Sequence, residues 1–195
     1  VYGDGRWYIR SLDNRVIAWG EPWGGGTLTP VSGDFNGDGK GDLAVYADGL
    51  WYIASLSQIS NSVMALQGVL AMGEAWGAPG YRAVSGDYDG DGISDLAVVK
   101  DGVWFVRSVQ GNVILWAEPW GMAEMTPVSG DYDGDGISDL AMYMERLGLW
   151  FIRSASGELL LWGGAFGGTG FVPVSGDFDG DGARDLAVYG NGLWY

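Results

Sequence analysis

The sequence contains no cysteine and no histidine among its 195 residues, and it has only 10 Lys and Arg against 25 Asp and Glu. The absence of cysteine excludes a disulfide framework, a Cys-zinc site and a thiol nucleophile. The absence of histidine excludes a Ser-His-Asp triad, a His-metal site and the usual general base near neutral pH. A formal net charge of -15 argues against binding to the phosphates of nucleic acid or to an anionic membrane surface. We therefore expect no nucleic-acid partner.

Long apolar runs are also absent, because no run approaches the ~18 residues that a membrane span needs. We expect no membrane insertion. The chain is not typical of a disordered acidic segment, since 47% of its residues are hydrophobic and 18% are charged. It begins at Val1 rather than at Met, and we expect a mature form or an excerpt of a longer protein.

An internal repeat organises the whole chain. Four segments align without gaps: VSGDFNGDGKGDLAVY (31–46), VSGDYDGDGISDLAVV (84–99), VSGDYDGDGISDLAMY (128–143) and VSGDFDGDGARDLAVY (174–189). A repeat in the forties of residues is typical of propellers and solenoid-like arrays.

Each repeat unit predicts four short strands: the VSGD(F/Y) run, the DLAVY run, an aromatic run such as LWFIRS (149–154), and an apolar run such as LLLWG (159–163). Four strands in each unit of about 45 residues fit a β-propeller blade. We expect an all-β fold, a β-propeller of four-stranded antiparallel blades. A single domain over 1–195 then comprises a partial unit (1–30), units 31–83, 84–127 and 128–173, and a partial unit (174–195).

The number of blades stays open between four and five, with five favoured. The last VSGDF strand completes the first blade in one arrangement, and two blades are three-stranded in another. In a third, the chain is part of a larger propeller or of a head-to-tail assembly, which makes a homo-oligomer or filament an alternative. The segment 56–70 carries extra residues, and we interpret it as an extended loop or a longer hairpin.

The loop between the first two strands of each unit reads D-x-(D/N)-x-D-G-x-x-D, and it places oxygen-bearing Asp or Asn side chains at positions 1, 3, 5 and 9. These residues are Asp34, Asn36, Asp38 and Asp42; Asp87, Asp89, Asp91 and Asp95; Asp131, Asp133, Asp135 and Asp139; and Asp177, Asp179, Asp181 and Asp185. The backbone carbonyl at position 7 is a further candidate ligand, from Lys40, Ile93, Ile137 and Ala183. Six or seven oxygen ligands without nitrogen or sulfur suit Ca²⁺, whereas Mg²⁺ demands a stricter octahedron.

We therefore predict four Ca²⁺ sites. An EF-hand is excluded, because position 12 holds Val or Met rather than Glu and strands flank the loop. Asn36 replaces one carboxylate, so we expect the first site to bind more weakly. The alternative is an Asp- and Gly-rich turn that binds nothing, but four copies with the same spacing favour the metal site.

These motifs resemble the FG-GAP/VCBS repeat of bacterial extracellular proteins, which is related to the calcium loops of integrin α-subunit propellers and of some fungal lectins. The motif GDFDGDGxxDLAVY, the WYIRS-like strand and the WG-containing strand carry the resemblance, which covers nearly the whole chain. It implies a β-propeller with structural Ca²⁺, an extracellular or cell-surface location, and a role in adhesion, surface display or carbohydrate binding.

Three functions compete. A non-catalytic, calcium-stabilised structural or adhesive module with a protein partner is favoured. A lectin is the alternative, in which a repeated loop aromatic stacks on a sugar ring; these residues are Trp23, Trp76, Trp120 and Phe166. Packing between blades is the simpler explanation of the same residues. An enzyme is disfavoured, because the metal sites already account for the repeated Asp residues.

Overall fold

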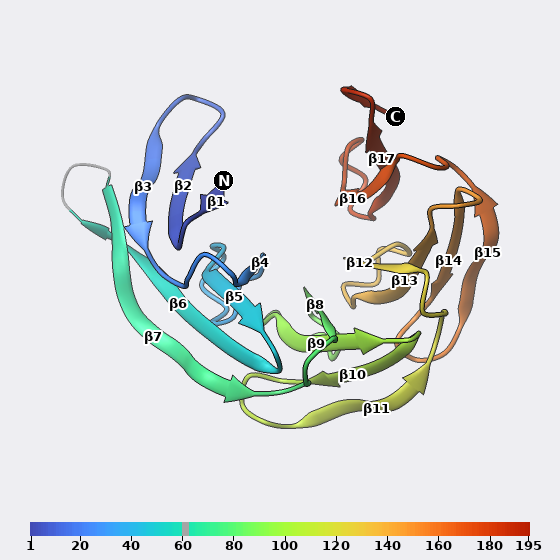
Figure 1. Ribbon diagram of the computed structural model, residues 1–195, viewed down its shortest axis with the longest axis horizontal. Coiled ribbons are helices and arrows are strands. Elements are labelled where there is room, and N and C mark those ends of the chain that lie inside the picture. The colour runs from blue at the N-terminus through green and yellow to red at the C-terminus, as the bar shows by residue number, and fades with distance from the viewer. Residues whose placement is uncertain (60–62) are drawn as a thin grey trace. The chain divides into compact units, whose positions relative to one another are not determined.

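The chain is an all-β propeller of five blades, and the computed structural model describes residues 1–59 and 63–195. Eighteen strands are present in this described part. Blades 2, 3 and 4 have four strands, and blades 1 and 5 have three. Within each blade the strands lie side by side in chain order (Figure 1). The pairs in blades 1, 2, 4 and 5 are antiparallel, as are β9–β10 and β10–β11 of blade 3.

The strand bounds follow the units. Blade 1 comprises β1 (Tyr2–Gly3), β2 (Arg6–Arg10) and β3 (Val16–Pro22). Blade 2 comprises β4 (Thr29–Val31), β5 (Leu43–Ala47), β6 (Leu50–Ile59) and β7 (Val63–Ala75). Blade 3 comprises β8 (Arg82–Gly86), β9 (Asp95–Lys100), β10 (Val103–Arg107) and β11 (Val113–Pro119). Blade 4 comprises β12 (Thr126–Gly130), β13 (Asp139–Met144), β14 (Leu149–Arg153) and β15 (Leu159–Ala165). Blade 5 comprises β16 (Val172–Gly176), β17 (Asp185–Gly190) and β18 (Leu193–Trp194).

Two compact units divide the chain, Val1–Ala83 and Val84–Tyr195. The first holds blades 1 and 2, the second holds blades 3 to 5, and the division falls inside β8. In the described part of the chain, no helix is long and apolar enough to span a bilayer.

In blades 2, 3 and 4 the second strand is buried on both faces, as expected for a strand that neighbouring blades cover. All six residues of β13 are buried, and in β9 only the last residue is exposed. The third strand alternates, so that Trp104 and Val106 of β10 point into the core. In the second unit these residues form one core with Leu140 and Met142 of the next blade.

Tight turns join the second and third strands. In blade 3, Asp101 and Gly102 both have positive φ, 52° and 79°, which is the conformation that a two-residue type I′ hairpin requires. The same Asp-Gly or Asn-Gly dipeptide makes this turn in blades 1, 2 and 5.

The extra residues of the second unit lengthen a hairpin, which confirms one of the two interpretations of segment 56–70. Strands β6 and β7 pair from Leu50↔Ala75 to Ile59↔Val63. Residues 60–62 of this segment lie outside the described residues.

Candidate metal centres

The acidic loops connect the first and second strands of blades 2 to 5, as predicted: β4 to β5, β8 to β9, β12 to β13 and β16 to β17. Each loop folds around the carboxylate at position 1. In blade 3, Asp87 accepts the backbone N–H of Gly90 at 2.6 Å on Oδ1 and that of Gly92 at 2.7 Å on Oδ2. Both glycines have positive φ, 79° and 83°, so the loop can turn back on this aspartate.

The carboxylate at position 9 is buried beneath the loop and accepts a backbone N–H from the residue that follows position 1. Asp95 is 1% exposed, and its Oδ2 accepts the backbone N–H of Tyr88 at 2.8 Å. Asp139 makes the same contact with Tyr132 at 2.7 Å. Burial and then the neighbouring carboxylates raise the pKa of both groups to about 7. A buried carboxylate among like charges is a group that a cation would stabilise.

Three loops bring the carboxylates of positions 1, 3 and 9 together. In each, one oxygen of every member lies within 4.8 Å of the others. The groups are Asp87, Asp89 and Asp95; Asp131, Asp133 and Asp139; and Asp177, Asp179 and Asp185. These all-oxygen donor sets could each hold one hard cation.

Position 5 lies outside these triads. Oδ1 of Asp91 accepts the backbone N–H of Ile93 at 2.8 Å, and Asp135 and Asp181 make the equivalent bond. The position 5 carboxylate therefore stabilises the turn toward position 7. Its second oxygen remains the candidate ligand.

The loop of blade 2 differs from the other three. All of its residues are described, yet its three aspartates form no such group. Nδ2 of Asn36 instead donates to Oδ1 of Asp42 at 3.3 Å, and Nζ of Lys40 lies 3.5 Å from Oδ2 of Asp38. The Asn36 amide and the Lys40 ammonium thus contact the carboxylates of Asp42 and Asp38, which a metal cation would otherwise bind. Burial raises the pKa of Asp42 to about 6.

The loop aromatics proposed for sugar binding lie against the strands of their own blades. Trp23, Trp76 and Trp120 are half-buried, and Phe166 is 38% exposed. In every case the backbone carbonyl of this residue accepts the indole N–H of the tryptophan on the aromatic strand of the same blade, at 2.9 Å from Trp104 to Trp120. This regular bond supports a packing role for the four residues.

A second aromatic ladder, which the sequence reading did not single out, is more exposed. Trp19, Trp116 and Trp162 recur on the outermost strands, and Trp162 is 69% exposed. Each stands edge-on to an aromatic ring of the third strand, as Trp162 does to Phe151 at 5.2 Å. The recurrence was visible in the sequence, because tryptophan occupies the same position of the outermost strand in three units, and Met72 occupies it in the remaining one.

One polar group lies beside this ladder in the second unit. Nη2 of Arg153 donates to Oε1 of Glu118 at 2.7 Å, and the guanidinium lies 5.2 Å from the ring of Trp120. Trp120 in turn stands edge-on to Trp162 at 6.0 Å.

The comparisons with known proteins establish the fold. No family model matches the chain, and no curated protein matches it. A lectin of Agrocybe aegerita that recognises non-reducing terminal N-acetylglucosamine superposes with a TM-score of 0.54 at 16% identity, over 86% of this chain and 51% of the lectin. The Vibrio cholerae biofilm matrix protein Bap1 aligns at 20% identity and a TM-score of 0.40, over 100% of this chain and 32% of that protein. The chain thus spans about half the length of the lectin, and it shares the propeller fold with it.

Proposed function

We propose that this chain is a non-catalytic, calcium-stabilised module of an extracellular or cell-surface protein, in which the acidic loops hold Ca²⁺ and the propeller presents a surface to a protein or glycan. The observation that carries the proposal is the convergence of three carboxylates in each of three successive loops. The resemblance to FG-GAP/VCBS repeats is consistent with this function.

Calcium suits these loops better than magnesium does. The ligands are the carboxylates at positions 1, 3, 5 and 9 and the backbone carbonyl at position 7, a set of oxygens on a flexible loop. Mg²⁺ would require near-ideal octahedral geometry and would retain water. Without a cation, the carboxylates repel one another, and this repulsion contributes to the raised pKa of Asp95 and Asp139.

The loop of blade 2 binds Ca²⁺ more weakly in this proposal. It has one carboxylate fewer, and the Lys40 ammonium lies beside Asp38. Extracellular modules function with calcium sites of about 10⁻⁴–10⁻³ M, so a weak site still fills outside cells. Because the proposed metal sites use the repeated carboxylates, we assign no acid–base pair among the described residues, and we propose no reaction for the chain.

Thermal unfolding in CaCl₂, in MgCl₂ and in EGTA tests this function. We expect a higher Tm with Ca²⁺ than with EGTA, and a smaller effect of Mg²⁺. Asp95→Asn should lose part of the calcium-dependent gain. Asp101→Asn is the matched control, because this exposed turn position lies outside the loops and accepts Asn. An equal Tm in all three solutions would refute the proposal.

Glycan binding is the second candidate function, and the cluster of Glu118, Trp120, Arg153 and Trp162 favours it over the loop aromatics alone. Trp162 is 69% exposed and stands edge-on to Trp120. Arg153, which donates to Glu118, lies beside the ring of Trp120, so this pair adds a donor and an acceptor to the cluster. An aromatic plane beside charged hydrogen-bonding groups is suited to a sugar ring.

A glycan array, probed in Ca²⁺ with the wild type and with Trp162→Ala, tests this second function. We expect binding by the wild type and its loss in the variant, with an unchanged Tm in Ca²⁺ because the side chain is exposed. No bound glycan, or equal binding by both proteins, would contradict it.

A further inference from the structure

An Asn-Gly dipeptide lies in the acidic loop of blade 2, at the position where the other three loops carry Asp-Gly. Asn36 is partly exposed, and Gly37 is exposed with φ +72°. The backbone nitrogen that follows an asparagine can attack its side-chain amide, and glycine favours this reaction because it has no side chain that hinders the approach. The dipeptide therefore supplies the two groups that asparagine deamidation requires, a nucleophile and an amide.

The nitrogen of Gly37 is already in contact with a carboxylate. Its N–H donates to Oδ1 of Asp34 at 2.7 Å. The same oxygen accepts the N–H of Asn36 at 3.3 Å and that of Asp38 at 3.2 Å, so the bond from Gly37 is the shortest of the three. Loss of this proton makes the amide nitrogen a nucleophile, and a carboxylate in hydrogen-bond contact is placed to accept it. Asp34 is thus positioned as a general base.

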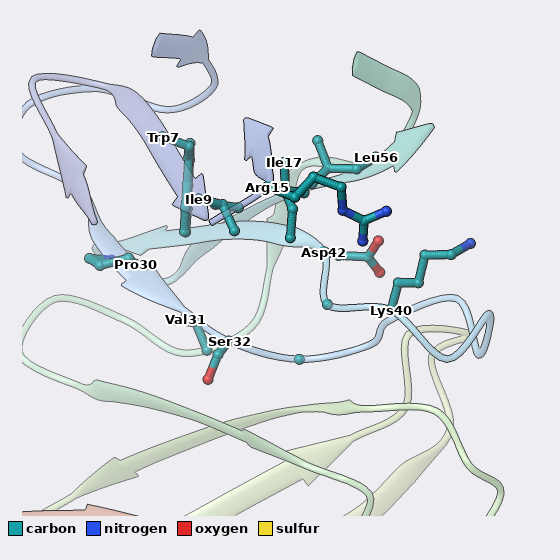
Figure 2. Close-up of a pocket in the computed structure, with 12 residues that line it drawn as sticks. Trp7, Ile9, Arg15, Ile17, Pro30, Val31, Ser32, Lys40, Asp42 and Leu56 are labelled. Carbon is teal, nitrogen blue, oxygen red and sulfur yellow. The ribbon is translucent and has the colours of Figure 1, made fainter. Parts of the chain in front are cut away.

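The side-chain amide of Asn36 is held at both ends. Its Oδ1 accepts the N–H of Asp38 at 2.9 Å, and its Nδ2 donates to Oδ1 of Asp42 at 3.3 Å. Figure 2 shows the Asp42 carboxylate where the loop runs into β5. The Asp38 N–H contacts the oxygen on which negative charge develops when Cγ is attacked, and it therefore acts as an oxyanion donor. Asp42 fixes the rotation of the amide, which makes it a positioning residue.

The other loops show that an aspartate fits at this position. In blade 3, Oδ1 of Asp89 accepts the N–H of Asp91 at 3.3 Å, and the N–H of Gly90 donates to Asp87 at 2.6 Å. The Asn-Gly dipeptide makes the same two bonds in blade 2, and the loops of blades 4 and 5 repeat them. Each loop with aspartate at position 3 brings three carboxylates together, whereas the blade 2 loop does not. Conversion of the asparagine to aspartate would therefore supply the missing member.

From these contacts we propose that Asn36 is a modification site, at which the loop deamidates its own asparagine and thereby completes the fourth calcium site. The N–H proton of Gly37 passes to Asp34, the Gly37 nitrogen bonds to Cγ of Asn36, and the Cγ–Nδ2 bond breaks. Nδ2 leaves as ammonia with the proton that Asp34 accepted, and a succinimide ring remains. Water then adds its hydroxyl to Cγ and its proton to the Gly37 nitrogen. The product is an aspartate at position 36 in an intact main chain.

The hydrogen bond from Asp38 also directs the hydrolysis. Its N–H contacts Oδ1 of Asn36 and so polarises Cγ rather than the main-chain carbonyl, and water opens the ring on the side that gives aspartate. Attack on the main-chain carbonyl would give isoaspartate, whose extra backbone atom does not match the loops of the other blades. The completed calcium site rests on the proposed function, whereas the deamidation itself requires no metal.

Peptide mapping of the whole chain by chromatography and mass spectrometry tests the deamidation, in EGTA at neutral pH. Asn191 is the matched control, because Asn191-Gly192 forms the turn between β17 and β18 and the described contacts give its side chain none of the three bonds. We expect Asn36 to convert at least about tenfold faster than Asn191, since a positioned general base contributes about 10²–10⁴-fold. In guanidinium chloride, which removes these contacts, the two should convert at similar rates. Slower conversion of Asn36 in the folded chain than in denaturant, or isoaspartate as the main product, would overturn the proposal.

Two variants test the two steps separately. Asp34→Asn removes the proposed base but keeps an oxygen that can accept the N–H of Gly37, so Asn36 should convert as slowly as Asn191; an unchanged rate would refute the role of Asp34. Asn36→Asp has the sequence of the product, and in equilibrium dialysis it should bind the fourth Ca²⁺ at least about tenfold more tightly than the wild type does, because ligand charge tunes calcium affinity. Equal affinity would refute the completed site. A chain that binds no Ca²⁺ in any loop while Asn36 still converts would refute the proposed function and the completed site, with the deamidation supported by the mass change.

Discussion

The backbone N–H of Ser138 donates to the carbonyl oxygen of Asp87 at 2.6 Å, and this bond joins the acidic loop of blade 4 to that of blade 3. Arg184 makes the same bond to Asp131, from blade 5 to blade 4, also at 2.6 Å. Asp87 and Asp131 are the first candidate ligands of their loops, and Asp139 directly follows Ser138. The proposed calcium sites of the second unit are therefore connected through the main chain.

This connection predicts coupled calcium binding. Asp139→Asn should abolish tight Ca²⁺ binding in the blade 4 loop. It should also weaken Ca²⁺ binding in the blade 3 loop about fivefold, because a metal-free blade 4 loop no longer fixes Asp87 through the Ser138 hydrogen bond. Calorimetric calcium titrations of the metal-free variant and of Asp101→Asn measure this. Unchanged affinity at the remaining sites would show that the loops act independently.

The stability of the metal-free protein should depend on pH in an unusual direction. The pKa of Asp95 and of Asp139 is raised to about 7, from 3.8 for the free side chain. The folded state therefore binds protons more tightly than the unfolded state, and the free energy of unfolding falls as pH rises from about 4 to about 7. Urea unfolding in EGTA across this range checks the sign. In saturating Ca²⁺ the decline should disappear, because the metal stabilises the ionised carboxylates; a metal-free stability that rises toward pH 7 would contradict the prediction.

The turn glycine of blade 3 offers a matched pair of variants. Gly102 has φ +79°, and a Cβ there would lie 2.3 Å from the backbone of Gly121. Gly92 has a similar φ, +83°, but a Cβ there meets nothing within 4 Å. We expect Gly92→Ala to cost about 1 kcal/mol of unfolding free energy from the strained backbone alone, and Gly102→Ala to cost clearly more. Chemical unfolding of both proteins in Ca²⁺ measures the difference, and equal costs would show that the close approach to Gly121 is relieved elsewhere.

The buried tryptophans should stabilise the blades through their indole N–H as well as through packing. Trp104→Phe leaves the carbonyl of Trp120 without its 2.9 Å donor and opens a cavity in the core. We expect a loss of about 2–4 kcal/mol. Trp116→Phe in the same blade is the control, because this side chain is 68% exposed and its replacement by another aromatic ring should change stability by less than about 0.5 kcal/mol. Similar losses for both variants would contradict this account.

The repeats made most of the fold predictable. Invariant spacing between Asp87, Asp95 and the following apolar run indicated a strand, an acidic loop and a second strand, and the structure confirms this order in four blades. The Asp-Gly dipeptides indicated tight turns, since they supply the positive φ that a two-residue hairpin requires. Local signals of this kind need no tertiary information.

The rest depended on tertiary contacts. The spacing alone predicts that Asp91 is a metal ligand in the same way as Asp87 and Asp95. In the structure, however, one carboxylate oxygen of Asp91 accepts the backbone N–H of Ile93. The blade 2 loop differs because Asn36 donates to Asp42, a bond whose geometry only the folded loop defines.

Equilibrium dialysis of the metal-free chain against Ca²⁺ tests the central claim most directly, because it counts the ions that each chain binds. We predict three ions bound in the loops of blades 3, 4 and 5, a fourth and weaker ion in the loop of blade 2, and loss of one of the three in Asp95→Asn. A chain that binds no Ca²⁺ at millimolar concentration would contradict the account.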